Sequence, residues 1–221
     1  MNSLLTDPVA PLLTRLFAEA AAADAPLRSE LAHSSPEARA ALMNRAKTDY
    51  RGFYGMAKEL FLPISPETGR LLYLLARSTK ARAIVEFGTS FGLSTLHLAA
   101  AVKDNGGGRV IGSEFEPQKV SRAKQHLSLA GLSEFVEVRE GDATETLARD
   151  LPAQVDLLLL DGAKVLYPLI LGLVEPRLRA GALIVADNAD HNPEFLAQIR
   201  DPANGYLSLP FAEDVELFMR L

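Results

Sequence analysis

The chain of 221 residues contains no cysteine, which excludes a disulfide framework, a zinc-thiolate site and a thiol nucleophile. Any metal ion must therefore be held by oxygen or imidazole ligands. The chain also has no excess of basic residues, because its net charge is −5 at pH 7. A protein whose main partner is nucleic acid or an anionic membrane needs a basic face. The composition therefore favours an enzyme that acts on a small molecule, without nucleic-acid or membrane partners.

Long hydrophobic runs are absent as well. No apolar stretch approaches the roughly 20 residues of a membrane span, and the amino terminus lacks a basic region followed by a hydrophobic core. A cytoplasmic location is the default expectation. Hydrophobic residues make up 48% of the chain, enough to bury the core of one domain with an appended segment. We expect a helical extension over residues 1–60, for capping or dimerisation, and an α/β domain over 61–221.

The first third of the chain reads as helical, because apolar residues recur at helical spacing after Asp-Pro or Ser-Pro pairs. We expect helices over residues 11–23, 36–48 and 66–78, with Pro26 ending the first. The last helix is expected to turn Leu71, Leu72, Leu74 and Leu75 inward. Between them, a short aromatic-rich element over 50–56 either packs against the main domain or forms a lid over a flat substrate.

Strands and helices then alternate along the chain. Strands are expected over 83–88, 109–114, 135–139, 155–160 and 182–187, with helices over 92–103, 117–130, 144–149, 165–178 and 193–200. This alternation predicts a Rossmann-like, doubly wound, mostly parallel sheet of seven strands in an α/β fold. The last two strands, 206–209 and 215–220, have no helix between them and are expected to form an antiparallel hairpin at one edge.

The stretch 84–92 carries the clearest nucleotide-site pattern. An apolar strand with one acid, Glu86, runs into Gly88 and Gly92, which allow a sharp turn and close ligand approach at a helix start. The spacing is G-x-x-x-G rather than G-x-G-x-x-G, so a dinucleotide is not favoured. An ordinary strand-to-helix turn is the alternative. Glu86 is costly to bury unless it is paired or hydrogen-bonded, and a cationic or amine-bearing ligand would explain it.

Polar residues follow the other strands, at the edge where open α/β sheets bind ligands. Glu114 closes the second strand, 22 residues after Gly92, where an acid can accept both hydroxyls of a ribose. A solvated strand end, with Glu116 binding instead, is the alternative. Asp142 and Ala143 follow the third strand, at the height expected for an adenine edge.

Two strand ends suggest a metal site. Asp161 ends one strand, and Asp187 and Asn188 end the next one along the chain. If these strands are neighbours, three hard oxygen ligands converge and leave room for substrate, as in a magnesium site. Lys164 lies within reach of anything bound there, and His191 could line the acceptor pocket. For each residue alone, a solvated side chain at a loop start is the alternative.

In this order and spacing, the motifs resemble the metal-dependent class I O-methyltransferases related to catechol and caffeoyl-CoA O-methyltransferases. The resemblance covers roughly residues 58–221. The residues that carry it are Glu86-Phe87-Gly88-Thr89, Ser94, Glu114, Gly141-Asp142-Ala143, Asp161-x-x-Lys164-x-x-Tyr167 and Asp187-Asn188.

The resemblance implies S-adenosylmethionine as the cofactor and one hydroxyl of a small aromatic vicinal diol as the methyl acceptor. It assigns to the cofactor Ile64, Glu86, Gly88, Thr89, Ser94, Glu114, Asp142, Ala143 and Asp161. It implies a divalent cation, Mg²⁺ with Mn²⁺ or Ca²⁺ as alternatives, on Asp161, Asp187 and Asn188. Lys164 would be the general base, with Asp161 beside it in the catalytic set. Family members are commonly homodimers, and we expect one here.

Two departures leave the acceptor open. Ala163 stands where the plant caffeoyl-CoA enzymes carry another aspartate, and the tail from Tyr206 to Val215 offers no match for the glutamate that orients catechol in the animal enzyme. Three other functions are alternatives to an O-methyltransferase. A methyltransferase for hydroxyuridine in transfer RNA is disfavoured by the acidic charge, and an NAD-dependent oxidoreductase by the glycine spacing. A non-catalytic cofactor-binding domain is disfavoured by the complete metal set and Lys164.

Overall fold

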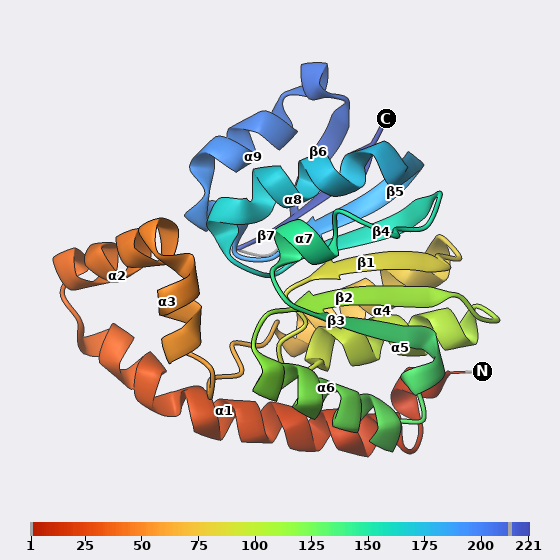
Figure 1. Cartoon of the computed structure of the whole chain (residues 1–221), viewed down its shortest axis with the longest axis horizontal. Helices are drawn as coiled ribbons and strands as arrows, with labels where there is room; N and C mark the ends of the chain where they lie inside the picture. The colour runs from red at the N-terminus through yellow and green to blue at the C-terminus, as the bar shows by residue number, and fades with distance from the viewer. Residues whose placement is uncertain (1, 212–213) are drawn as a thin grey trace.

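The computed structural model describes residues 2–211 and 214–221. Its strands are β1 (Ala83–Phe87), β2 (Arg109–Glu114), β3 (Val136–Glu140), β4 (Val155–Leu160), β5 (Leu178–Ala186), β6 (Tyr206–Phe211) and β7 (Val215–Arg220). They form one sheet in the order β3-β2-β1-β4-β5-β7-β6 (Figure 1). β1 to β5 pair in parallel, whereas β7 is antiparallel to both β5 and β6. The predicted fold class is confirmed, including the antiparallel hairpin at the edge.

Helices cover both faces of the sheet (Figure 1). They are α1 (Val9–His33), α2 (Pro36–Thr48), α3 (Tyr50–Met56), α4 (Pro66–Ser78), α5 (Leu93–Asp104), α6 (Pro117–Leu129), α7 (Ala143–Thr146), α8 (Tyr167–Val174) and α9 (Pro193–Arg200). Short 3₁₀ turns are η1 (Ser3–Leu5), η2 (Ser133–Phe135), η3 (Lys164–Leu166), η4 (Glu175–Arg177), η5 (Ala189–His191) and η6 (Pro202–Asn204). No helix in the described ranges is both long and apolar enough to cross a bilayer.

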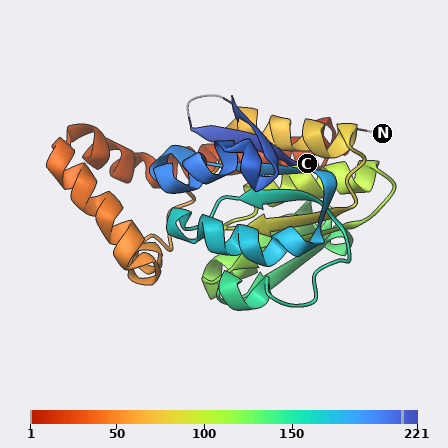
Figure 2. The ribbon, with the colours of Figure 1, turned by 90° about the horizontal axis from the view of Figure 1, so that it is seen from above.

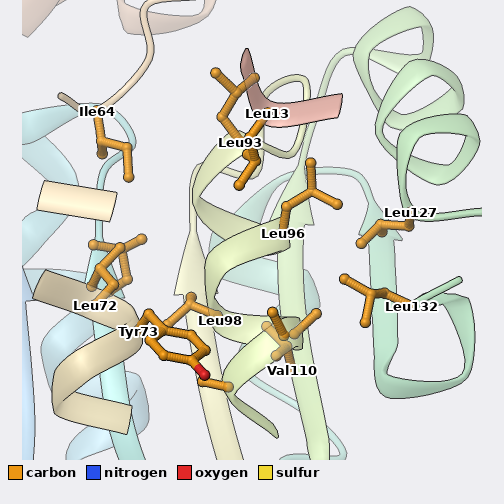
Figure 3. Close-up of a cluster of buried hydrophobic side chains, with 14 of the residues drawn as sticks. Leu13, Ile64, Leu72, Tyr73, Leu93, Leu96, Leu98, Val110, Leu127 and Leu132 are labelled. Carbon is orange, nitrogen blue, oxygen red and sulfur yellow. The ribbon is translucent and has the colours of Figure 1, made fainter. Parts of the chain in front are cut away.

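The parallel strands are buried on both faces because successive side chains point to opposite sides of a strand. In β1, Ile84 joins the core formed with α1, α4, α5 and α6, whereas Val85 and Phe87 join the core beneath α7, α8 and α9. Figure 3 shows part of the first core, where Tyr73 of α4 lies beside Leu98 of α5. The two cores hold the strand ends in a common plane, which positions the site.

Helix α4 begins where the sequence predicts. Ser65 accepts the N–H of Thr68 at 3.0 Å, and Pro66 occupies the first turn, where a missing N–H costs little. The expectation that Leu74 faces inward is wrong, because its side chain is 62% exposed. Leu72 and Ala76 face the core, and a residue two positions from either lies about 200° around the helix.

The prediction that Pro26 ends the first helix is also wrong, because α1 continues through it to His33. Proline removes only its own N–H from the helix ladder. The helical turn before Pro26 is hydrogen-bonded to the segment that follows α3. The buried carboxylate of Asp24 accepts the N–H groups of Phe61 at 2.8 Å and Leu62 at 2.9 Å. These bonds stabilise the helix across the proline.

The predicted helix over 165–178 is correct only in its middle. It divides into η3, α8 and η4, and the chain enters β5 already at Leu178, four residues before the expected start. Pro176 lies in η4 and cannot donate to the ladder, so α8 ends ahead of it. The other boundaries coincide with the prediction or differ from it by at most three residues.

Helices α2 and α3 project beyond the sheet (Figures 1 and 2) and contain no buried residue. Helix α3 is attached to the strand ends by polar contacts and by Tyr50 and Tyr54, which pack against the core beneath α7, α8 and α9. The Tyr50 hydroxyl donates to Asp142 at 3.2 Å, and Arg51 forms an ion pair with the same carboxylate. In contrast, the first half of α1 packs into the main core through Leu12, Leu13 and Leu16. The division near residue 60 and the homodimer stay predictions.

Candidate active site

A cavity of about 440 Å³ opens at the carboxyl ends of β1 to β4, the position expected for a ligand in an open α/β sheet. Its walls include five of the nine residues assigned to the cofactor from the sequence, namely Gly88, Glu114, Asp142, Ala143 and Asp161. The other four, Ile64, Glu86, Thr89 and Ser94, are buried behind these walls. Below we call this space the cofactor cavity.

Gly88 makes the turn that the sequence predicts. Its φ is +97°, and a Cβ there would lie 2.6 Å from the carbonyl oxygen of Asp161, closer than real Cβ contacts allow. The N–H groups of Gly88 and Thr89 both donate to the Ser113 carbonyl, at 3.2 and 3.1 Å. Gly92 also has a positive φ, +87°, and is the residue before α5. The glycine pair is therefore required by the backbone path that forms the cavity floor.

Glu114 is positioned to bind a vicinal hydroxyl pair. Its side chain is nearly buried and lies in the cavity wall. One oxygen accepts the N–H of Ser90 at 2.8 Å, and the other accepts the N–H of Glu116 at 3.0 Å. A carboxylate oxygen can accept a second hydrogen bond, so both remain available to a ligand. The alternative Glu116 contributes its backbone to holding Glu114.

Glu86 is hydrogen-bonded within the protein, which accounts for its burial, and its contact with a cationic ligand stays a prediction. Its carboxylate is fully buried and accepts hydroxyl groups from Thr89 at 2.9 Å, Ser94 at 2.7 Å and Thr95 at 2.6 Å. Burial raises the pKa of Glu86, and the three hydroxyl donors only partly oppose this. These bonds join β1 to the first turn of α5 and so hold the cavity floor from behind.

Asp142 caps α7 and connects it to α3. One carboxylate oxygen accepts the N–H and the hydroxyl of Thr144, at 2.9 and 2.7 Å, while the other accepts Tyr50 and Arg51. Burial acts to raise the pKa of Asp142, but the Thr144 and Arg51 contacts lower it overall. Asp142 therefore fastens α3 across the cavity, next to Ala143.

The register of the sheet brings the predicted metal ligands together. Leu160 of β4 pairs with Ala186 of β5, so Asp161 and Asp187 follow adjacent strand ends. The Asp161 N–H donates to Phe87 at 2.8 Å, and the Asp187 N–H donates to Leu160 at 2.9 Å. The buried Tyr167 hydroxyl contacts the carbonyl oxygens of Leu160 and Asp187 at 2.8 and 2.7 Å. These bonds fix the two strand ends relative to each other.

Negative charge is concentrated at this point. Burial raises the pKa of both carboxyl groups, and the charge of Asp161 raises the pKa of Asp187 further. The Lys164 Nζ lies 3.3 Å from Asp161 Oδ1. Burial disfavours the ammonium form, but Tyr167 and Asp161 raise the pKa of Lys164 overall. A further cation bound here would stabilise the charged form of the two buried carboxylates, which lie beside only one ammonium group.

Asn188 completes the predicted set. Its backbone is left-handed, with φ of 46°, and its amide donates to Asp214 at 3.1 Å, which leaves the amide oxygen as a possible ligand. Across residues 2–211 and 214–221, no three His, Cys, Asp or Glu side chains converge into a metal-binding group. The predicted set has only two carboxylates, and its third donor is an amide. Carboxylate and amide oxygens fit a hard divalent cation such as Mg²⁺.

A second cavity of about 590 Å³ lies between the helical extension and this edge of the sheet. Lys164, Asn188 and His191 line it, so His191 lies where the sequence places it. Tyr54, Leu62 and Asp161 line both cavities. The two spaces therefore share the wall that these three residues form, and Asp161 in this wall also contacts Lys164. Below we call the second space the acceptor cavity.

Several wall residues were missed from the sequence. Lys119 lies in a predicted helix, yet it is buried with its Nζ 3.3 Å from the Ser90 hydroxyl, and burial lowers its pKa. Phe61 stacks on Phe91 with ring centroids 4.1 Å apart and lines the cofactor cavity. Asp24 holds Phe61 from behind. The sequence offered little signal for Asp24, because it is one of three acidic residues in α1, with Glu19 and Glu30.

Part of the chain is similar to known methyltransferases. Residues 85–189 match the family model described as a methyltransferase domain. The chain is 34% identical over 130 residues to a catechol O-methyltransferase from Niastella koreensis, which is 58% of each chain. It is also 34% identical over 140 residues to a catechol O-methyltransferase from Mycobacterium tuberculosis, 63% of each chain.

A solved structure has the same fold. The O-methyltransferase from Bacillus cereus in complex with SAH aligns with a TM-score of 0.65 and 22% identity, covering 81% of this chain and 91% of that one. Residues 85–189 thus match a methyltransferase domain model and the fold is shared with this structure, which agrees with the resemblance drawn from the motifs. The matched part spans 58% and 63% of the length of the two curated relatives.

Proposed function

We propose that this protein transfers the methyl group of S-adenosylmethionine to one hydroxyl of a small aromatic vicinal diol, with a divalent cation. The observation that carries this proposal is the junction of the two cavities at Asp161, with Lys164 at 3.3 Å. It is supported by two relatives that are named catechol O-methyltransferases and by the neighbour of the same fold in complex with SAH.

The cofactor cavity suits an adenosyl group with a charged amino-acid end. Glu114 offers two carboxylate oxygens to the ribose hydroxyls and would repel a 2′-phosphate. Gly88 leaves the floor free of a side chain, and Ala143 lies in the wall where the adenine would pack. Asp161 brings negative charge to the end where the sulfonium would lie, which favours the cationic methyl donor over its neutral product.

Asp161, Asp187 and Asn188 would hold the divalent cation. When bound, such a cation chelates both oxygens of the acceptor and lowers the pKa of the attacking hydroxyl. The protein supplies the position: Tyr167 fixes the two strand ends, and burial keeps competing water from the carboxylates.

Lys164 would remove the acceptor proton at its Nζ atom. Its ion pair with Asp161 and its raised pKa keep the lysine in the ammonium form. A general base must be neutral, so the negative potential around Lys164 has to be reduced before it can act. A cation held by Asp161 and Asp187 would supply that reduction. The Tyr167 ring lies beside the lysine, with its centroid 5.4 Å from Nζ.

Turnover of catechol with S-adenosylmethionine and Mg²⁺, followed by mass spectrometry of the methylated product, tests the proposal. We expect product from the wild-type protein and a fall in kcat of about 10² to 10⁴-fold for Lys164→Met, the usual effect of losing a general base. The control Lys124→Met removes an exposed lysine on α6 and should match the wild type. Binding of S-adenosylmethionine without methylation of any vicinal diol would contradict the proposed reaction.

A further inference from the structure

The acceptor cavity is larger than a bare diol ring needs. A cavity of about 150 Å³ accommodates one benzene-sized ligand, whereas this one measures about 590 Å³. A catechol placed at Asp161 would therefore leave about three-quarters of the space unfilled. The remaining space must be occupied by water or by another part of the acceptor.

The unfilled part is apolar. Away from the sheet, the walls are formed by side chains of three helices: Leu27 and Leu31 of α1, Leu42 and Met43 of α2, and Phe53 and Met56 of α3. We call this part the apolar chamber. The chemically reactive residues Asp161, Lys164 and Asn188 lie at the opposite end of the same cavity. The helices also contribute one charged residue to the wall, Lys47 at the end of α2, which is exposed to solvent.

Of the residues of α2 and α3, Tyr50 and Tyr54 pack against the core beneath α7, α8 and α9 while staying partly exposed. None of the residues of α2 or α3 is buried, although apolar side chains of both helices face the chamber. Met56 is 59% exposed, and Leu62, which lines both cavities, is 38% exposed. Polar contacts hold α3 to the domain through Asp142, and Figures 1 and 2 show both helices standing away from the sheet. An apolar occupant would bury these side chains.

We propose that the acceptor is a diol whose ring carries an extended apolar substituent, with the diol at Asp161 and the substituent in the apolar chamber. This inference rests on the proposed function, because it assigns the reacting hydroxyl to the Lys164 end. The occupant is an acceptor rather than a segment of protein, because Lys164 lines the same cavity and Asp161 lines both this cavity and the cofactor cavity. A permanent protein occupant would close the path by which a hydroxyl reaches both.

A series of 4-alkylcatechols from methyl to hexyl, compared with catechol, measures the contribution of the substituent. Burial of one methylene stabilises a complex by about 0.8 kcal/mol, which is about fourfold in affinity. We expect kcat/KM to rise about two- to fourfold per methylene until the chamber is full. The rise should appear in KM with kcat nearly constant, since the substituent binds equally in the ground and transition states. A kcat/KM that is independent of chain length would overturn the inference.

Two lysine substitutions on α2 locate the effect. Met43→Lys puts a charge into the chamber wall. The control Ala41→Lys puts the same charge on an exposed residue two positions away, about 200° around the helix. The ratio of kcat/KM for hexylcatechol to that for catechol should fall at least tenfold in Met43→Lys and stay at the wild-type value in Ala41→Lys. Equal ratios in the two variants would place the substituent elsewhere.

A probe that cannot chelate separates this inference from the proposed function. 4-Hexylresorcinol carries the same tail on a 1,3-diol, so its binding relative to resorcinol, measured by calorimetry, reports the chamber without any chemistry. Tighter binding of the hexyl compound, lost in Met43→Lys, supports the chamber even if no catechol is methylated. If the hexyl group adds no affinity and Met43→Lys instead converts a dimer into a monomer, a second copy of the chain fills the chamber and the inference is refuted.

Discussion

Asp24 offers a test of how the amino-terminal helix controls the site. Its buried carboxylate holds the N–H groups of Phe61 and Leu62, and both residues line the cofactor cavity. In Asp24→Ala both donors lose their partner in a buried or half-buried position, at about 1 to 3 kcal/mol each. We therefore expect a loss of about 2 to 6 kcal/mol in the free energy of unfolding.

The loss should extend to function. Leu62 has a left-handed backbone, with φ of 44°, which a leucine adopts only when its surroundings enforce it. Without Asp24 this segment should relax, and the KM for S-adenosylmethionine should rise, because Phe61 and Leu62 no longer hold the wall. Urea denaturation and steady-state kinetics measure the two effects. Glu30→Ala, an exposed acid on the same helix, is the matched control.

Asp24→Asn refines the test, because an amide oxygen can accept one of the two N–H groups while its own NH₂ opposes the other. This variant should fall between Asp24→Ala and the wild type. If Asp24→Ala unfolds at the same urea concentration as Glu30→Ala, the assignment of Asp24 as the support of this segment is wrong.

The remaining predictions concern pH, cofactor and metal. Burial lowers the pKa of His97 to about 4. Between this pH and about 6.5, the unperturbed pKa of histidine, the unfolded chain therefore binds more protons than the folded chain. The stabilisation from neutral His97 is complete above the unfolded pKa and is lost as pH falls toward 4, by about 3 kcal/mol. Denaturation curves of the wild type and His97→Leu should differ in slope over this window, and equal slopes would exclude His97 as the cause. Glu114→Ala should weaken binding of S-adenosylmethionine by about 1 to 3 kcal/mol in a calorimetric titration, whereas wild-type affinity would remove Glu114 from the site. EDTA should abolish methyl transfer, and Mg²⁺ should restore it. The variant Asp187→Ala should lose turnover but keep its affinity for the cofactor, because Asp187 is not part of the cofactor cavity wall. Full activity of a metal-stripped sample would refute the role of the cation.

Local patterns in the sequence were enough to predict the sheet and the positions of several site residues. Alternation of short apolar strands with helical segments specifies a parallel sheet, because parallel strands need long crossover connections. The acids that follow these strands must then lie at one edge, which is why Asp161, Asp187 and Glu114 could be placed without a structure. Gly88 could be placed because only glycine tolerates a positive φ with a backbone group so close.

What only the tertiary structure decided depends on distances between segments far apart in the chain. Glu86 has three hydroxyl partners that its own sequence position did not reveal, and the bonds from Asp24 to Phe61 and Leu62 stabilise a helix through Pro26. The apolar chamber exists because α2 and α3 stand away from the sheet, and its size follows from their placement and not from their own periodicity. Secondary structure follows from neighbours along the chain, whereas cavities, ion pairs and pKa shifts follow from neighbours in space.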